Sequence, residues 1–110
     1  MIDWQRVTDL KAEVGSEDFD EIVPIFLEEV AEVTERLRTA VILETLEDDL
    51  HFLKGSAMNL GFCEFSSLCG AGEASAAKGN AAAVDVTAIL TSFDASRRIF
   101  LNGLADGSAA

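Results

Sequence analysis

Apolar residues recur every three or four positions along most of the chain, which is the spacing of α-helices that bury one face. One such run covers residues 19–37, and a second covers residues 43–60. The second run is out of phase with the first by one residue, so a single continuous helix would place polar side chains in the core. We therefore predict two helices separated by a turn at about Thr39 to Ile42.

Helix start and stop signals divide the N-terminal part of the chain. Asp3 is a predicted N-cap for a short helix that ends at Gly15. Ser16 is a predicted N-cap for the next helix, with acidic residues in its first turn. Pro24 falls inside that helix, so the helix either kinks there or begins later, at about residues 21–23.

Two more helices are predicted in the C-terminal half, at about residues 63–78 and 82–104, with a turn at Gly79-Asn80 between them. No strand pattern appears in the sequence, and long helices with short connections are typical of antiparallel neighbours. The predicted fold class is therefore all-α, as an antiparallel up-down four-helix bundle with an additional short N-terminal helix.

Residues 1–110 are expected to form one domain, with a core at about residues 3–104 and a flexible tail at residues 105–110. Gly70 and Gly72 fall inside the fourth helix, where they either permit close helix approach or loosen the helix. The expected core residues of the third and fourth helices are Leu43, Leu46, Leu50, Leu53, Ala57, Leu60, Phe65, Leu68, Cys69 and Ala76. For the last helix they are Ile89, Phe93, Phe100 and Leu104.

The net charge of −12, from 20 acidic and 8 basic residues, restricts the choice of partners. Nucleic acids and anionic membranes require a basic surface, so neither is expected as a partner. No apolar run reaches the roughly 18 residues of a membrane span, and no signal peptide is apparent, so a cytoplasmic location is expected. Cys63 and Cys69 are expected to be reduced, and with one histidine they do not make a zinc site.

The only histidine, His51, lies roughly 130° around the third helix from the middle of its apolar stripe, so its imidazole should face solvent. Lys54, Gly55 and Met58 follow at three, four and seven residues and share that face. A solvent-exposed histidine is partly uncharged near neutral pH, so a ring nitrogen can act as a nucleophile. Lys54 would offset the charge of a phosphoryl group on that nitrogen, and Gly55 would leave room for a bulky partner.

Three acidic residues on the preceding turns of this face, Glu44, Glu47 and Asp48, would repel an incoming phosphoryl group and attract positive groups on a partner. Each feature also has an ordinary explanation, because most exposed histidines are inert and a mid-helix glycine often serves helix packing. Two other classes therefore stay open. One is an adaptor bundle that binds partners through this face without being phosphorylated. The other is a metal or cofactor bundle, which needs paired Glu-x-x-His ligands that one histidine cannot supply.

The string His-Phe-Leu-Lys-Gly-Ser-Ala at residues 51–57, followed by Asn-Leu-Gly at residues 59–61, resembles the signature of histidine phosphotransfer (HPt) domains. A looser match continues in the fourth helix, at Phe65, Leu68, Cys69 and Glu73. Gly72 departs from the family pattern, which commonly has leucine there. The turn before Leu43 also lacks the usual glycine or aspartate.

This resemblance implies a phosphocarrier rather than an enzyme with kinase or ATP-binding activity. His51 would accept a phosphoryl group from an aspartyl-phosphate receiver domain and pass it to another receiver, with Lys54 as the charge partner and Gly55 as the clearance residue. The implied partners are response-regulator receiver domains and, beyond them, a hybrid histidine kinase. Magnesium is expected on the receiver, no cofactor or metal is expected on this chain, and we expect a monomer. Residues expected to contact the partner are Phe52, Met58, Glu47 and Asp48.

Overall fold

The computed structural model describes residues 1–106, and the all-α prediction is confirmed over that range. The elements are α1 (Trp4–Val14), α2 (Ser16–Thr39), α3 (Leu43–Asn59), α4 (Cys63–Ala77), a short 3-10 helix η1 (Ala81–Ala83) and α5 (Val86–Ala105). Ala105, predicted to start the tail, still belongs to α5, and residues 107–110 lie outside the described residues. No helix within residues 1–106 is long and apolar enough to cross a membrane.

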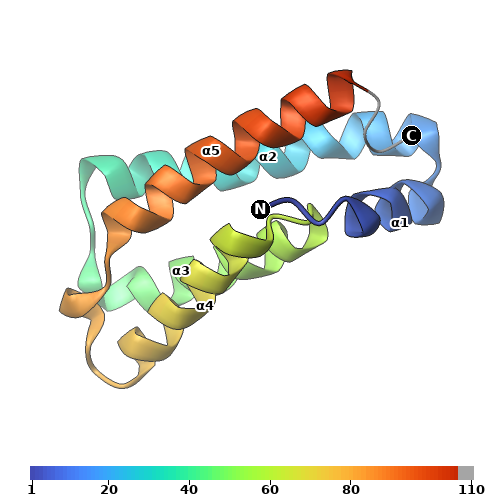
Figure 1. Ribbon diagram of the computed structural model, residues 1–110. Helices are drawn as coiled ribbons and strands as arrows, with labels where there is room; N and C mark the ends of the chain where they lie inside the picture. The colour runs from blue at the N-terminus through green and yellow to red at the C-terminus, as the bar shows by residue number, and fades with distance from the viewer. Residues whose placement is uncertain (107–110) are drawn as a thin grey trace.

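Helices α2 to α5 run along the length of the molecule and surround one core (Figure 1). Each contacts the next in the sequence, and α5 closes the arrangement by contacting α2. The connections before and after α3 are three residues each, at residues 40–42 and 60–62. These contacts and short connections are consistent with an up-down order. Helix α1 packs at one end, against α2 and α3.

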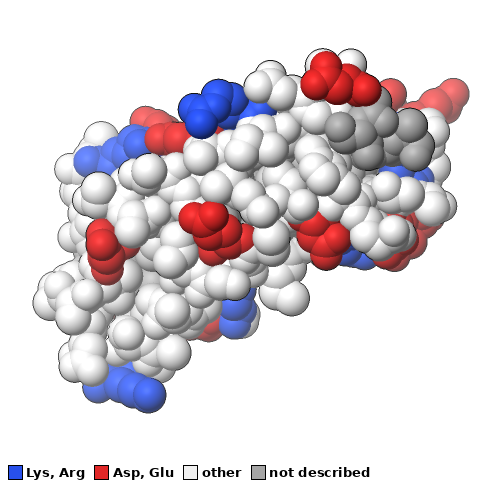
Figure 2. All heavy atoms as spheres, in the orientation of Figure 1, with Lys and Arg blue, Asp and Glu red and all other residues white. Residues whose placement is uncertain are grey.

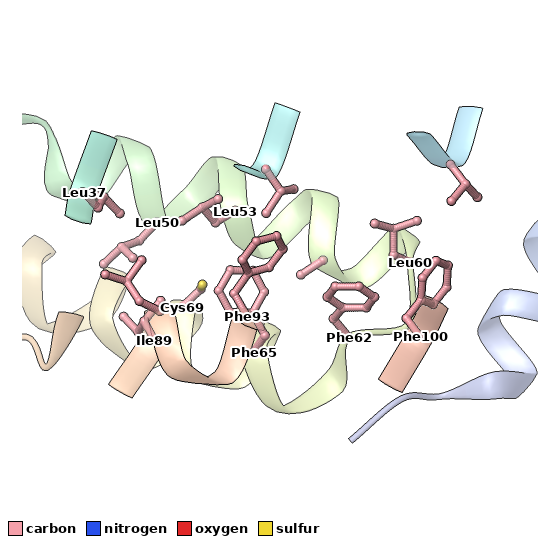
Figure 3. Packing of buried hydrophobic residues seen from close by; sticks show 14 of the residues in the cluster. Leu37, Leu50, Leu53, Leu60, Phe62, Phe65, Cys69, Ile89, Phe93 and Phe100 are labelled. Carbon is pink, nitrogen blue, oxygen red and sulfur yellow. The ribbon is translucent and has the colours of Figure 1, made fainter. Parts of the chain in front are cut away.

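The core lies between the leucine face of α3 and aromatic side chains of α4, of α5 and of the turn before α4 (Figure 3). The leucines that are completely buried are Leu46, Leu50 and Leu53. The central aromatic residues are Phe62, Phe65, Phe93 and Phe100, whose neighbouring ring centroids lie 5.3 to 6.4 Å apart. Burying each leucine contributes about 1.5–3 kcal/mol, so this face fixes how α3 is rotated about its axis.

Gly15 joins α1 to α2 without an intervening loop. Its φ of 87° lies in the left-handed region that favours glycine, and its carbonyl accepts a hydrogen bond from the Phe19 N–H at 2.9 Å. The prediction that Ser16 caps α2 is wrong, because Gly15 makes the turn and Ser16 is already the first helical residue. The late start at residues 21–23 is also wrong. The helix continues through Pro24, which is exposed, so the carbonyl that loses its N–H partner can bond water.

Other boundaries agree with the sequence more closely. The N-cap at Asp3 is confirmed, since its carboxylate accepts from the Arg6 N–H at 3.2 Å. The turn between the second and third helices is confirmed at residues 40–42. The last helix begins at Val86 rather than Ala82, because the Asp85 carboxylate accepts from the Ala88 N–H at 3.0 Å and caps the helix there.

Two expectations about packing have different outcomes. Leu43, expected in the core, is 46% exposed. It is the first residue of α3, and side chains on a helix point back toward its N-terminus, here past the end of the bundle. Gly72 permits close packing of neighbouring side chains against α4, which was one of the two interpretations of this glycine. A β-carbon there would lie 2.9 Å from Leu50 Cδ1 and 3.1 Å from Val84 Cγ1. Both cysteines are free, as predicted.

Two helical glycines provide a paired test of the packing. A β-carbon at Gly103 would overlap the indole ring of Trp4, whereas one at Gly55 would meet no atom within 4 Å. Gly55→Ala should therefore stabilise the fold by about 0.5–1 kcal/mol through helix propensity. Gly103→Ala should destabilise it, because overpacking costs about 1–3 kcal/mol. Urea unfolding of the two variants checks this, and a rise in the Gly103→Ala midpoint would contradict the tight contact with Trp4.

Candidate functional site

His51 projects from the side of α3 that faces away from the core, and its side chain is 70% exposed. Leu50 on one side and Leu53 on the other are fully buried, so the histidine cannot turn inward without exposing them. The predicted exposure of His51 is confirmed, and its cause is the phase of the leucines. The imidazole is therefore open to a macromolecular partner.

A single carboxylate, that of Glu73 on α4, contacts both His51 and Lys54. Its Oε2 lies 2.7 Å from His51 Nδ1, and its Oε1 lies 2.6 Å from Lys54 Nζ. When the imidazole is uncharged, the Nδ1–H donates to Glu73 and the lone pair is on Nε2. The contact from α4 therefore orients the ring and, in the uncharged form, leaves the lone pair on Nε2.

Lys54 lies differently from the sequence expectation. Its side chain turns toward α4, is only 33% exposed and ends on Glu73 rather than beside the open edge of the imidazole. Its stem passes over Gly70, where a β-carbon would lie 3.4 Å from Lys54 Cδ. The lysine side chain thus lies directly against the surface of α4 at position 70.

Two groups at this site, the Glu73 carboxyl and the Cys69 thiol, have pKa values shifted from their ordinary values. The hydrogen bond from Lys54 is the main cause that lowers the pKa of Glu73. The contact with His51 adds to it, and partial burial opposes it. Burial, with a smaller contribution from the Glu73 charge, raises the pKa of Cys69 to about 12. Glu73 is therefore ionised at neutral pH, and the Cys69 thiol is not.

The other predicted site residues lie around His51 on α3. Gly55 has open space on its outer side, and Phe52 and Met58 are exposed apolar side chains. Glu47 and Asp48 are exposed, and within residues 1–106 neither forms an ion pair. Among the same residues, no three His, Cys, Asp or Glu side chains gather into a candidate metal site.

Charge is unevenly distributed around the bundle. Helix α2, which flanks α3 on one side, carries eight of the 20 acidic residues. The side of the molecule over α4 and α5 is mostly uncharged, with separate acidic and basic side chains (Figure 2). Helix α3 thus lies between an acidic flank and a helix, α4, whose surface is largely neutral.

The family comparison agrees with this geometry. A model of the Hpt domain matches residues 21–99, which is more than half of the chain. The chain belongs to the Hpt domain family. No curated protein and no solved structure matches it. Histidine phosphotransfer in phosphorelays is the general role of Hpt domains, which are phosphocarriers rather than kinases and interact with receiver domains and histidine kinases.

Two residues of this Hpt domain site were not among the sequence-predicted site residues. Glu73 was noted only as a position that matches the family, and Gly70 only as a residue that either permits close helix approach or loosens the helix. Glu73 contacts His51 and Lys54 only because α3 and α4 lie close together at this point. The periodicity of a single helix does not predict how far it lies from its neighbour. The available signal was that Glu73 is one of only two acidic residues on α4, the other being Glu64.

The shared carboxylate makes a testable prediction about acid. The Glu73 pKa should lie below the ordinary glutamate value of about 4.3 and should rise in Lys54→Met, with a smaller rise in His51→Ala. Because the folded-state pKa of Glu73 is depressed, its ionised carboxylate stabilises the fold. This stabilisation is fully present above the unfolded-state pKa and is lost as pH falls through the folded-state pKa. NMR titration of the side-chain carboxyl measures the shift, and an unchanged Glu73 pKa in Lys54→Met would contradict the ion pair.

Proposed function

We propose that this Hpt domain carries a phosphoryl group on Nε2 of His51, which it receives from the aspartyl phosphate of one receiver domain and gives to the aspartate of another. The observation that supports this most directly is the contact of Glu73 with Nδ1 of an imidazole that is otherwise open to solvent. It provides both a defined nucleophilic nitrogen and access for a protein-sized phosphodonor.

The proposed step is an in-line displacement at phosphorus. The Nε2 lone pair forms the new N–P bond while the bond from phosphorus to the receiver's carboxylate oxygen breaks, and the electron pair leaves with that carboxylate. The ring becomes positively charged and keeps its proton on Nδ1, where the Glu73 carboxylate offsets the charge. Transfer to the second receiver reverses these events. The magnesium ion that phosphoryl transfer requires would be bound by the receiver.

Lys54 has two parts in this proposal. While His51 is unphosphorylated, the Lys54 ammonium lowers the pKa of Glu73 and keeps its carboxylate ionised. The carboxylate can then accept the hydrogen bond from the Nδ1 proton. Since Lys54 and His51 contact the two oxygens of one carboxylate, the ammonium is also held near the histidine. After transfer it would offset part of the charge of the phosphoryl group.

The receiver would dock on the outer face of α3. Phe52 and Met58 would supply apolar contacts, and Gly55 would allow the receiver's backbone to approach the imidazole. Glu47 and Asp48 would face basic groups on the receiver and help to select it. The acidic flank on α2 would also disfavour receivers with acidic contact surfaces.

Phosphotransfer is the direct test of the proposal. Receiver domains from the same organism, phosphorylated with acetyl phosphate, should transfer label to the chain in a form that is acid-labile and lies on Nε2 by ¹⁵N NMR. His51→Gln should remove the label completely. Absence of transfer from every receiver would contradict the proposal and favour the adaptor function, and label that survives His51→Gln would contradict the site.

Clearance at Gly55 can be tested separately from folding. A β-carbon there meets no atom within 4 Å, and leucine is a better helix former than glycine, so Gly55→Leu should fold. It should slow transfer from receivers by about 100-fold, because small displacements of reacting groups have effects of that size.

Phosphoramidate, which phosphorylates imidazole without a docked protein, should still label Gly55→Leu at His51. Ala12→Leu, an exposed substitution on α1, is the matched control and should transfer normally. Normal receiver transfer by a folded Gly55→Leu protein would refute the clearance role.

A further inference from the structure

A groove of about 370 Å³ opens at the end of the α3 face that carries His51. One wall is the exposed side chain of Met58, near the end of α3. A second wall is the first turns of α4, with Cys63, Ser66 and Ser67, and a third is the start of α1, with Asp3 and Arg6. We call this feature the Met58 groove. None of these wall residues has a part in the proposed transfer chemistry.

The Met58 groove is continuous with the proposed transfer site. Met58 follows His51 by seven residues on the same side of α3, which places it about 10 Å farther along the helix. On the α4 side, the Ser66 hydroxyl reaches the backbone carbonyl of Lys54 at 3.5 Å. A standard protein interface buries about 800 Å² on each partner, so a receiver centred on His51 would cover the mouth of the groove.

The lining suits an apolar side chain. Met58 is 59% exposed, the highest value among the large apolar residues that are exposed in residues 1–106. The serine and cysteine walls are uncharged. The two charged residues are already engaged, since the Asp3 carboxylate accepts from the Arg6 N–H at 3.2 Å and the Arg6 guanidinium lies 3.3 Å from Glu13. The groove is therefore a nearly neutral concavity on a chain with a net charge of −12.

We propose that the Met58 groove is a second anchoring site for the receiver domain docked at His51, and that it takes one apolar side chain presented by that receiver. Deeply packed apolar anchors carry much of the binding energy of protein interfaces, and methionine adapts its shape to such partners. This inference rests on the proposed phosphotransfer function. It adds the contact that would hold the receiver in register while its aspartyl phosphate meets Nε2.

Cys63 allows the groove to be filled chemically in the native protein. Its thiol is exposed at the groove wall, whereas Cys69 is buried and its pKa is raised to about 12. N-ethylmaleimide at neutral pH should therefore modify Cys63 alone. The adduct should slow transfer from phosphorylated receivers by at least about tenfold, which corresponds to 1.4 kcal/mol, while phosphoramidate should label His51 at the rate of the untreated protein.

Two controls separate groove filling from other effects of the reagent. Cys63→Ser should transfer at the same rate before and after exposure to N-ethylmaleimide. The double variant Cys63→Ser, Thr91→Cys carries the same adduct at an exposed position of α5, a helix that does not line the Met58 groove. This labelled variant should transfer at the rate of its unlabelled form.

A second variant fills the groove without touching Cys63, whose thiol also donates to the Met1 carbonyl at 2.9 Å. Ser67→Trp on α4 should slow receiver transfer as the adduct does, and Thr91→Trp should not. Transfer at the unmodified rate by either the alkylated protein or a folded Ser67→Trp protein overturns the groove proposal alone. Failure of the unmodified protein to accept label from any receiver overturns the phosphotransfer function and the groove proposal together.

Discussion

The burial of the leucine face of α3 is the constraint on which the site depends. Each leucine contributes about 1.5–3 kcal/mol, whereas a mid-helix glycine such as Gly55 costs about 1 kcal/mol. The leucines thus set the rotation of α3 despite the glycine. With that rotation fixed, the Asp49 carboxylate accepts two hydrogen bonds from the Arg36 guanidinium of α2, at 2.8 and 2.9 Å. On the other side, Lys54 Nζ lies 2.6 Å from Glu73 Oε1 of α4. Both pairs lie at the surface with the basic partner partly exposed. Surface ion pairs contribute at most about 1 kcal/mol, so these pairs position side chains more than they hold the fold.

The position of Lys54 changes the interpretation of the histidine-lysine spacing. The sequence predicts that the Lys54 ammonium lies beside the imidazole, where it would offset the charge of a phosphoryl group on His51. In the structure it binds Glu73 and lowers the pKa of that carboxyl group. In the proposed transfer, an ionised Glu73 is the acceptor for the Nδ1 proton of His51. Lys54 would therefore act on the histidine first through this carboxylate, before a phosphoryl group arrives.

The sequence predicted those features that depend on one helix at a time. The phase shift between residues 19–37 and 43–60 located the turn, and the same phase predicted that His51 is exposed. Features that depend on how two segments meet were missed. Leu43 lies beyond the end of the bundle, and Gly15 rather than Ser16 makes the turn into α2.

The contact of Glu73 with His51 belongs to the same class, because it requires a specific distance between α3 and α4. Gly72 allows the α4 backbone to lie close to Leu50. A β-carbon at position 72 would lie 2.9 Å from Leu50 Cδ1, so a larger residue would require that side chain to shift. At Gly70 the Lys54 side chain lies directly against α4, since a β-carbon there would be 3.4 Å from Lys54 Cδ. The periodicity of α4 left two interpretations open for both glycines, close helix approach or a looser helix, and it does not identify the side chain that each one contacts.

The Met58 groove depends on a segment that lies outside the family match. The model of the Hpt domain covers residues 21–99, whereas Asp3 and Arg6 come from the start of the chain. That segment is held over the turn between α3 and α4, where the Asp3 N–H donates to the Gly61 carbonyl at 2.7 Å. Gly61 has φ of 75°, and a β-carbon there would lie 2.6 Å from the Asp3 carbonyl oxygen, so glycine is required on both counts.

The two parts of the proposed interface therefore have different origins. Phosphoryl transfer would use His51, Lys54 and Glu73, which all lie within the matched region. The groove wall from α1 lies outside it and can differ between Hpt domains without disturbing that chemistry. Specificity is a difference between affinities and cannot come from contacts that every receiver makes. In the proposed interface, selectivity for one receiver would therefore come from contacts outside the reacting residues, such as those of this wall.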